Sequence, residues 1–179
     1  VLDHCEDAEL SGAGVIHDGR IAAQLGIAGK PAASEDVMIA RNAVLARETG
    51  CPVHMQHVST AGGVEILKMA RRIGWPVTCE VTPHHFCLTE EAVLHHGTNA
   101  KMNPPLRTEE DRAAVLEAIC DGTVSVIATD HAPHTAEDKA LSLEAAPNGI
   151  IGLEAAVPIC LRDLYHSGRL ELIDLIGKF

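Results

Sequence analysis

Short apolar runs that alternate with amphipathic helical patterns constrain this chain more than any other feature. Four runs have the length and composition of strands and are marked out by Gly, Pro or Asp; they cover residues 1–6, 53–58, 77–82 and 124–130. Alternation of strands and helices predicts a parallel sheet whose strands are joined by crossover helices. We therefore expect an α/β fold.

A barrel and an open sheet are both compatible with this alternation. A complete eight-stranded α/β barrel takes about 250 residues, so a chain of 179 residues with four strands matches roughly half of one. A doubly wound open sheet is the alternative, but no G-x-G-x-x-G pattern follows any run, so its dinucleotide-binding version has no support. Because Val1-Leu2-Asp3-His4 reads as a strand entered partway along, we expect a fragment.

Three predicted helices have recognisable ends. We expect Ser34, Thr60 and Thr108 to act as N-caps, because each has a side-chain oxygen and precedes a helical pattern. Gly50 and Gly74 are expected to end the first two helices. The predicted apolar face of the first helix consists of Val37, Ala40, Val44 and Leu45.

The acidic balance of the chain narrows its range of partners. There are 14 Lys and Arg against 25 Asp and Glu, which gives a formal net charge of −11, and only 2% of the residues are aromatic. This composition argues against nucleic-acid binding, which needs basic stripes and stacking surfaces. No apolar run approaches the roughly 20 residues that span a bilayer, so we expect no membrane partner.

The six cysteines favour a reducing compartment. No two of them form a C-x-x-C pair, and most lie in apolar runs, where a thiol behaves as a small hydrophobic group. No signal peptide is visible at the start of the chain. We therefore expect free structural thiols and a cytoplasmic location.

Polar side chains close the apolar runs at the ends where an α/β barrel holds its active site. His4 ends the first run, His57 the second and Asp130 the last. Neutral imidazoles and a carboxylate suit zinc, and three protein ligands with an open position are typical of a catalytic zinc site. The spacing alone leaves another interpretation open, in which the histidines are hydrogen-bonded core residues and the Asp caps a turn.

Five local motifs occur in order along the chain and carry a specific resemblance. They are His4-Cys5-Glu6-Asp7, Gln56-His57-Val58-Ser59-Thr60, Asn103-Pro104-Pro105-Leu106-Arg107, Ala128-Thr129-Asp130-His131-Ala132-Pro133-His134 and Gly149-Ile150-Ile151-Gly152-Leu153-Glu154. With these motifs the chain resembles the class I, bacterial-type dihydroorotases of the amidohydrolase superfamily over essentially its whole length. The resemblance implies that residues 1–179 are a single partial domain. It would be the C-terminal half of a (β/α)8 TIM-like barrel of the amidohydrolase type, from strand five to strand eight, with the N-terminal half and the C-terminal end absent.

The resemblance also implies a zinc enzyme, with one or two Zn²⁺ ions in a complete site. His4 and His57 match two ligands of the more buried zinc. Asp130 matches a ligand of the other zinc that is also the catalytic general base and acid. The family's His-x-His motif, its substrate-binding Arg and its bridging carboxylate belong to earlier strands and have no second copy in this sequence.

The reaction implied by the resemblance is the reversible hydrolysis of dihydroorotate to N-carbamoyl-aspartate in de novo pyrimidine biosynthesis. Four residues match substrate contacts of the family: Asn103, His134, Asn148 and Gly149. Asn148 departs from the Phe or Ala that the family often has there. The implied partners are a small-molecule substrate, further copies of the chain in a homo-oligomer, and aspartate carbamoyltransferase. We expect the isolated 179-residue chain to be inactive.

Two other functions stay open. A hydantoinase or allantoinase resembles the same scaffold but bridges its metals through a carboxylated lysine. The non-enzymatic alternative is a dihydroorotase-like scaffold that only supports aspartate carbamoyltransferase. Such scaffolds tend to lose metal ligands, whereas the three that can be identified in this sequence are intact.

Other polar residues receive structural interpretations. Asn103 alternatively serves only the turn before Pro104, and Arg107 is expected to be a salt-bridge partner in a loop. Packing roles are expected for Glu80, His84 and His85. Surface or helix-end positions are expected for His17, His95 and His96.

Overall fold

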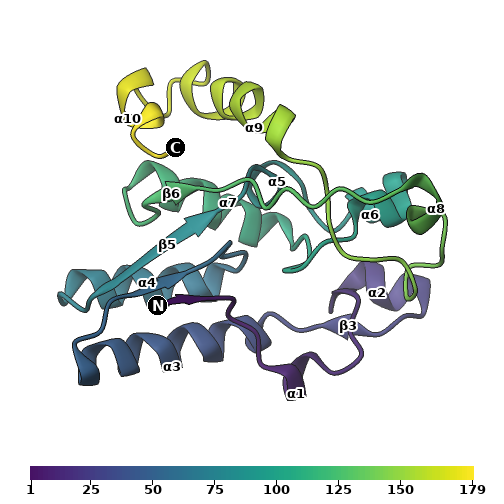
Figure 1. Cartoon of the computed structure of the whole chain (residues 1–179), viewed down its shortest axis with the longest axis horizontal. Coiled ribbons are helices and arrows are strands. Elements are labelled where there is room, and N and C mark those ends of the chain that lie inside the picture. Colours follow the sequence, from purple (N-terminus) through teal and green to yellow (C-terminus); the bar gives the residue numbers. More distant parts are fainter.

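A four-stranded parallel sheet lies at the centre of the computed structural model, which describes all 179 residues (Figure 1). The strand order is β1-β4-β5-β6, and Met55 of β4 is in register with Asp3 on one side and Cys79 on the other. The strands are β1 (Leu2–Asp3), β4 (Val53–Met55), β5 (Val77–Val81) and β6 (Val126–Ile127). The predicted parallel α/β arrangement is confirmed.

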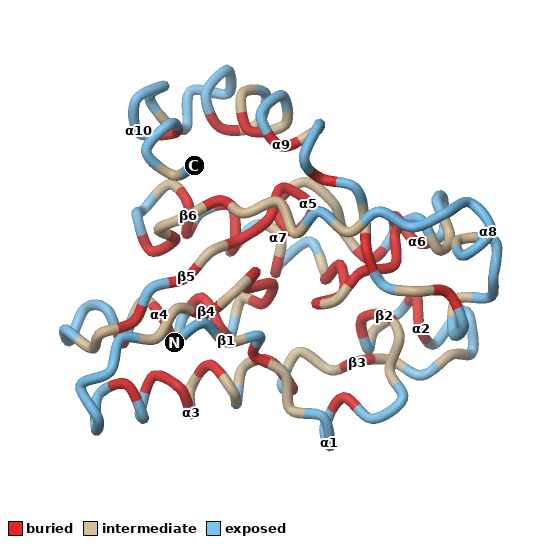
Figure 2. Tube along the Cα trace, viewed as in Figure 1, coloured by how far each residue is buried: buried red, intermediate tan, exposed pale blue.

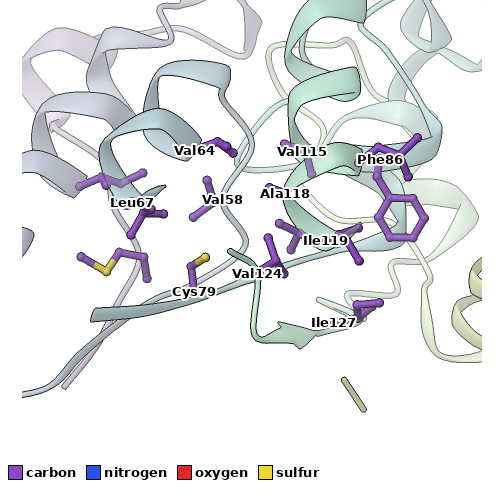
Figure 3. Close-up of a cluster of buried hydrophobic side chains, with 14 of the residues drawn as sticks. Val58, Val64, Leu67, Cys79, Phe86, Val115, Ala118, Ile119, Val124 and Ile127 are labelled. Carbon is purple, nitrogen blue, oxygen red and sulfur yellow. The ribbon is translucent and has the colours of Figure 1, made fainter. Parts of the chain in front are cut away.

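Three crossover helices cover one face of this sheet. They are α3 (Ala33–Thr49), α4 (Ala61–Arg72) and α7 (Glu109–Cys120). Val77, Cys79 and Val81 of β5 are buried against these helices, because alternate residues of a strand point to the same side. Figure 3 shows this core, with Val64 and Ile119 among the helical side chains that meet the sheet.

Short elements connect and flank this arrangement. The helices are α1 (Ala8–Ser11), α2 (Arg20–Leu25), α5 (Pro83–Cys87), α6 (Ala92–His96), η1 (Gly97–Ala100), α8 (Ala136–Lys139), α9 (Leu153–Cys160), η2 (Leu161–Tyr165) and α10 (Leu172–Ile176). A second, two-stranded parallel sheet pairs β2 (Ile16–His17) with β3 (Gly29–Lys30). A separate small core forms around Ile21, where the segment that contains β2 and α2 packs against α6.

The face of the main sheet that points away from the helices carries polar side chains. Nδ1 of His54 lies 2.8 Å from Oγ1 of Thr78, and its Nε2 lies 3.1 Å from Oε2 of Glu80. Leu2 on the same sheet is 69% exposed. Parallel sheets are normally covered on both faces, so a sheet covered on one side is unusual.

Two of the three predicted N-caps are confirmed. The Thr60 hydroxyl accepts a hydrogen bond from the Gly63 amide at 3.0 Å, and Thr108 forms a reciprocal capping box with Asp111. Gly50 ends α3 with a left-handed φ of 70°. Thr60 and Thr108 therefore mark where α4 and α7 begin, and Gly50 marks where α3 ends.

The prediction for the first helix is wrong in two respects. Ser34 lies inside α3 and its hydroxyl donates to the carbonyl of Pro31, because the helix begins one residue before it. Val37, Val44 and Leu45 are exposed, and the buried face is instead Ile39, Ala43 and Ala46 (Figure 2). The apolar residues selected from the sequence therefore do not mark the side of this helix that meets the sheet.

The strand predictions are too long, and two strands are missed. The run over residues 124–130 yields only β6, because Val124 and Ser125 precede the strand and residues 128–130 follow it. Strands β2 and β3 have two residues each, too short for a periodic signal. His17 is buried in β2, so its predicted surface or helix-end position is wrong, whereas His95 and His96 do end α6 at the surface.

Candidate functional site

His4 and His57 follow adjacent strands of the main sheet and meet at its carboxyl end. Nδ1 of His4 lies 3.0 Å from Nε2 of His57, and the two rings are nearly perpendicular, with centroids 4.6 Å apart. The pairing of β1 with β4 positions them, since parallel neighbours end at the same edge. The structure thus brings together the two histidines that the sequence predicts as metal ligands.

His57 and Asp130 share a backbone conformation found at no other non-glycine residue of the chain. Their φ angles are +33° and +43°. Such left-handed conformations cost on the order of 1–3 kcal/mol each and persist where the surrounding structure imposes them, often at functional sites. Both residues lie just after strands, at the end of the sheet where His4 also lies, which favours a functional interpretation.

The electrostatic surroundings of His57 favour a neutral imidazole. Burial is the main cause that lowers its pKa, and the neighbouring His4 acts in the same direction. The charges of Asp130 and Glu80 oppose this shift without reversing it, so both carboxylates act on the His57 ring. A neutral imidazole is the form that binds metals.

The two imidazoles fit a zinc ion. Two ligand nitrogens of a tetrahedral zinc at ~2.0–2.1 Å would be roughly 3.3 Å apart, close to the observed separation. Nδ1 of His57 is buried without a hydrogen-bond partner, so nothing inside the protein competes for this ring except His4. No group of three or more His, Cys, Asp or Glu is arranged to hold a metal, so Asp130 does not join His4 and His57 in a three-residue metal group.

A second set of polar residues surrounds the other side of the His4 ring. Nε2 of His4 lies 3.1 Å from Oε2 of Glu6, whose other oxygen accepts from Nζ of Lys30 at 2.7 Å. Burial alone would raise the pKa of Glu6, but hydrogen bonds from Lys30, Asn103 and His4 outweigh it and lower that pKa to about 2. Glu6 is therefore an ionised carboxylate beside His4. The sequence interpretation gave no role to Glu6, although it lies in the His4-Cys5-Glu6-Asp7 motif, or to Lys30, which no motif contains.

The amide of Asn103 belongs to the same network. Its Nδ2 lies 2.7 Å from Oε2 of Glu6 and 3.2 Å from Nε2 of His4, and its Oδ1 accepts from Nζ of Lys30 at 2.7 Å. This side chain therefore does more than serve the turn before Pro104. Its predicted contact with substrate stays a prediction, and in this structure its polar atoms are bonded within the protein.

The other predicted substrate contacts gather in a separate place. Nε2 of His134 donates to the carbonyl of Asn148 at 2.8 Å, and Gly149 lies so close to the chain that a Cβ there would be 2.6 Å from the Ala132 carbonyl oxygen. His134 and Gly149 line a cavity of about 220 Å³ together with Lys139. None of His4, His57, Asp130 or Asn103 lines this cavity.

Arg107 is a salt-bridge partner, as predicted, but it is buried. It pairs with Glu35 at 3.2 Å, and both side chains are almost inaccessible to solvent. Its guanidinium also donates to Oγ of Ser59, to the Lys30 carbonyl and to Nδ1 of His17. Arg107 thereby ties the loop that starts at Asn103 to the segment that follows His57.

His85 is a buried histidine with both ring nitrogens bonded, which agrees with its predicted packing role. Its Nε2 donates to the Pro104 carbonyl at 3.0 Å, and Oγ1 of Thr82 lies 2.9 Å from its Nδ1. Burial is the main cause that lowers its pKa, to about 3. This ring is therefore neutral in the folded chain at neutral pH.

We expect His85 to make folding sensitive to mild acid. Between about pH 6.5 and pH 3 the unfolded chain binds a proton at His85 that the folded chain does not bind, so stability falls as the pH is lowered, by up to about 1.4 kcal/mol per pH unit. Denaturant unfolding across this range is expected to show a shallower decline for His85→Gln than for the parent chain. The exposed His95→Gln should leave the decline unchanged, and equal slopes for both variants would contradict the assignment.

Known proteins with similar folds are barrels of the hydantoinase type. The chain superposes on D-hydantoinase (dihydropyrimidinase) from Thermus sp. with a TM-score of 0.85 and 26% identity, covering 99% of this chain and 41% of that one. For L-hydantoinase (dihydropyrimidinase) from Arthrobacter aurescens the TM-score is 0.83 and the identity 29%, covering 98% and 40%. The fold is therefore part of an α/β barrel of the amidohydrolase type.

Sequence similarity is higher to dihydroorotases. The "Dihydro-orotase-like" family model matches residues 1–62. The chain is 51% identical to the dihydroorotase of Pelotomaculum thermopropionicum and 48% identical to that of Anaplasma phagocytophilum, in each case over 99% of this chain. It spans about two fifths of the length of these curated relatives, 42% and 40%. The sequence is thus dihydroorotase-like along nearly all its length.

None of the helices of the chain combines the length and apolar character needed to cross a membrane.

Proposed function

We propose that the protein containing this chain is a zinc-dependent dihydroorotase, which opens the ring of dihydroorotate by hydrolysis to give N-carbamoyl-aspartate and also catalyses the reverse reaction. The observation that carries the proposal is 48–51% identity to dihydroorotases over 99% of the chain, with His4, His57 and Asp130 all present. Their strand-end positions support the proposal independently, because this edge of a parallel sheet is where α/β barrels hold their active sites.

His4 and His57 would hold one zinc between them, and Asp130 would be a ligand of the other zinc. A bound zinc ion supplies Lewis acidity that activates water and polarises an amide carbonyl. The incomplete shell of this chain supports a site whose remaining ligands come from residues outside 1–179, so we propose that these residues form a single partial domain. One or two zinc ions per complete site fit this arrangement.

Asp130 would move the proton in the reaction. Hydrolysis of a cyclic amide needs a base that removes a proton from the attacking water and an acid that protonates the departing ring nitrogen. One carboxylate can do both in turn, since the proton taken in the first step is the proton given in the second. The left-handed backbone at Asp130 sets this carboxylate at the turn that follows β6, close enough for its charge to act on His57.

Substrate recognition would depend on locally placed donors, because the chain as a whole is acidic. We propose that His134, Asn148 and Gly149 contact the substrate ring from the loop around the 220 Å³ cavity. The backbone of Gly149 can approach a ligand closely because no side chain fits there. Asn103 is the proposed contact on the side of the predicted metal ligands.

The setting of the reaction follows from the same proposal. Dihydroorotate hydrolysis and its reverse belong to pyrimidine biosynthesis, and we propose a cytoplasmic enzyme that forms a homo-oligomer and associates with aspartate carbamoyltransferase.

A hydantoinase fits less well, because identity to the hydantoinases is 26–29% against 48–51% to the dihydroorotases.

Substrate choice tests the proposal. The protein at its natural length is expected to carry one or two zinc ions and to convert dihydroorotate to N-carbamoyl-aspartate, measured by chromatography, with little turnover of hydantoin or allantoin. Preferential hydrolysis of hydantoin would favour the alternative enzyme. Zinc-free protein without turnover of any of the three substrates would favour the non-catalytic scaffold.

A further inference from the structure

Glu6 and Lys30 lie directly behind the predicted metal ligand His4 and have no part in the proposed reaction. Oε2 of Glu6 faces Nε2 of His4 at 3.1 Å, and Oε1 of Glu6 accepts from Nζ of Lys30 at 2.7 Å. Lys30 is only 8% exposed, so its charge is directed at Glu6 and at the oxygen of Asn103. The Glu6 carboxylate is half-buried and lies between the Lys30 ammonium and the His4 ring.

A neutral imidazole carries one proton, on either of its two nitrogens. With the proton on Nε2, His4 donates to an ionised carboxylate, and this is a strong, charge-assisted hydrogen bond. With the proton on Nδ1, a lone pair of Nε2 faces the Glu6 oxygen and the two acceptors repel. With the proton on Nδ1, Nδ2 of Asn103 can donate to Nε2 of His4 at 3.2 Å, but this neutral bond is longer than its 2.7 Å bond with Glu6 and weaker than the charge-assisted bond that His4 would lose.

The surroundings of His57 favour the same arrangement. If His4 is protonated on Nε2, its Nδ1 accepts from Nε2–H of His57 across the 3.0 Å contact. Nδ1 of His57, which is buried without a partner, then carries no proton, and no buried N–H is left unbonded. In the zinc-free chain, the opposite arrangement would bury an unpaired N–H there.

We infer that Glu6, held in place by Lys30, is a positioning residue that keeps the proton of His4 on Nε2 and presents Nδ1 to a metal ion. This inference rests on the proposed zinc site. Carboxylates that accept from the free N–H of a metal-bound histidine fix its tautomer and orientation, and their loss typically lowers metal affinity about 10–100-fold. Lys30 acts one step further away, by neutralising and orienting Glu6.

The tautomer of His4 can be read without any metal. In the zinc-free protein at its natural length, ¹⁵N-labelled at histidine and held near pH 8, long-range ¹H–¹⁵N spectra distinguish a protonated ring nitrogen from an unprotonated one. We expect His4, assigned by the loss of its signals in His4→Gln, to carry its proton on Nε2. A proton on Nδ1 would overturn the inference, and this measurement needs no variant of Glu6 to fold.

Zinc affinity tests the consequence. By competition with a zinc-binding dye, Glu6→Ala is expected to bind zinc about 10–100-fold more weakly than the parent protein. Lys30→Met should weaken binding in the same direction, whereas the control Glu9→Ala removes an exposed carboxylate of the same segment and should have no effect. Unchanged affinity in Glu6→Ala overturns the inference and leaves the zinc proposal intact. Absence of zinc binding in the parent protein, with the His4 proton on Nε2, overturns the zinc proposal and leaves the hydrogen-bond assignment intact.

Discussion

Replacing Asp130 by Asn is expected to lower the rate of dihydroorotate hydrolysis by about 10²–10⁴-fold in the protein at its natural length, the contribution typical of a positioned general base or acid. The substitution removes the carboxylate that would take a proton from water and return it to the ring nitrogen. Asn has nearly the same shape and is also tolerated in the left-handed conformation that Asp130 adopts, so the backbone at φ +43° should be retained. Steady-state kinetics in both directions of the reaction measure the effect.

Zinc content separates the two roles proposed for this carboxylate. If zinc is retained and turnover is lost, Asp130 acts in proton transfer, and if both are lost, it acts at least partly as a ligand. Asp174→Asn is a matched control, because Asp174 is an exposed residue of α10. An Asp130→Asn protein with undiminished turnover would contradict the proposed site.

The topology of the sheet could be predicted because apolar runs and helical patterns alternate clearly. The run at residues 77–82 corresponds to β5 almost residue for residue. The predicted runs that contain His57 and Asp130 are longer than β4 and β6, because sequence alternation does not reveal a positive φ. The positions wrongly assigned to strands therefore include the two residues whose conformation points to function.

The buried face of α3 could not be predicted from apolar periodicity. Asn42 and Glu35 are buried in this helix because each has a polar partner, Asp3 in one case and Arg107 in the other. Those partners come from β1 and from the loop before α7, far away in the sequence. Which side of a helix is buried depends here on such pairs, and apolar Val37 and Leu45 remain exposed.

The main residues of the candidate site could be predicted from the sequence, but the residues that hydrogen-bond to them could not. His4, His57 and Asp130 end predicted strands, and parallel strands bring their ends together. The Lys30 contact with Glu6 joins residues 24 positions apart, and the Asn103 contact with Glu6 joins residues 97 positions apart. No local pattern encodes such pairs, and Lys30 lies in a strand too short to have a periodic signal.

The buried ion pair between Arg107 and Glu35 leads to the largest expected effect on stability. Arg107→Met is expected to lower the free energy of unfolding by about 3–5 kcal/mol, because Glu35 stays buried without its partner and must either keep an unpaired charge or take up a proton. The substitution also removes the hydrogen bonds from Arg107 to Ser59 and to the Lys30 carbonyl. Denaturant unfolding of the variant and of Arg20→Met gives the comparison. Arg20 pairs with Glu91 at the surface, where both side chains are about 60% exposed, so its loss should cost only about 0–1 kcal/mol.

Two further measurements test whether the buried Glu35 carboxyl, left without Arg107, is the cause. Burial already raises the pKa of Glu35, and Arg107 is the main influence that opposes this shift. Without Arg107 the folded chain should hold a proton on Glu35 that the unfolded chain releases, so the stability of the variant should fall as the pH rises from about 5 to 8. The double variant Arg107→Met/Glu35→Gln carries no buried charge and should recover part of the loss. A double variant less stable than Arg107→Met, with no such pH dependence, would mean that the lost packing and hydrogen bonds of Arg107 are responsible.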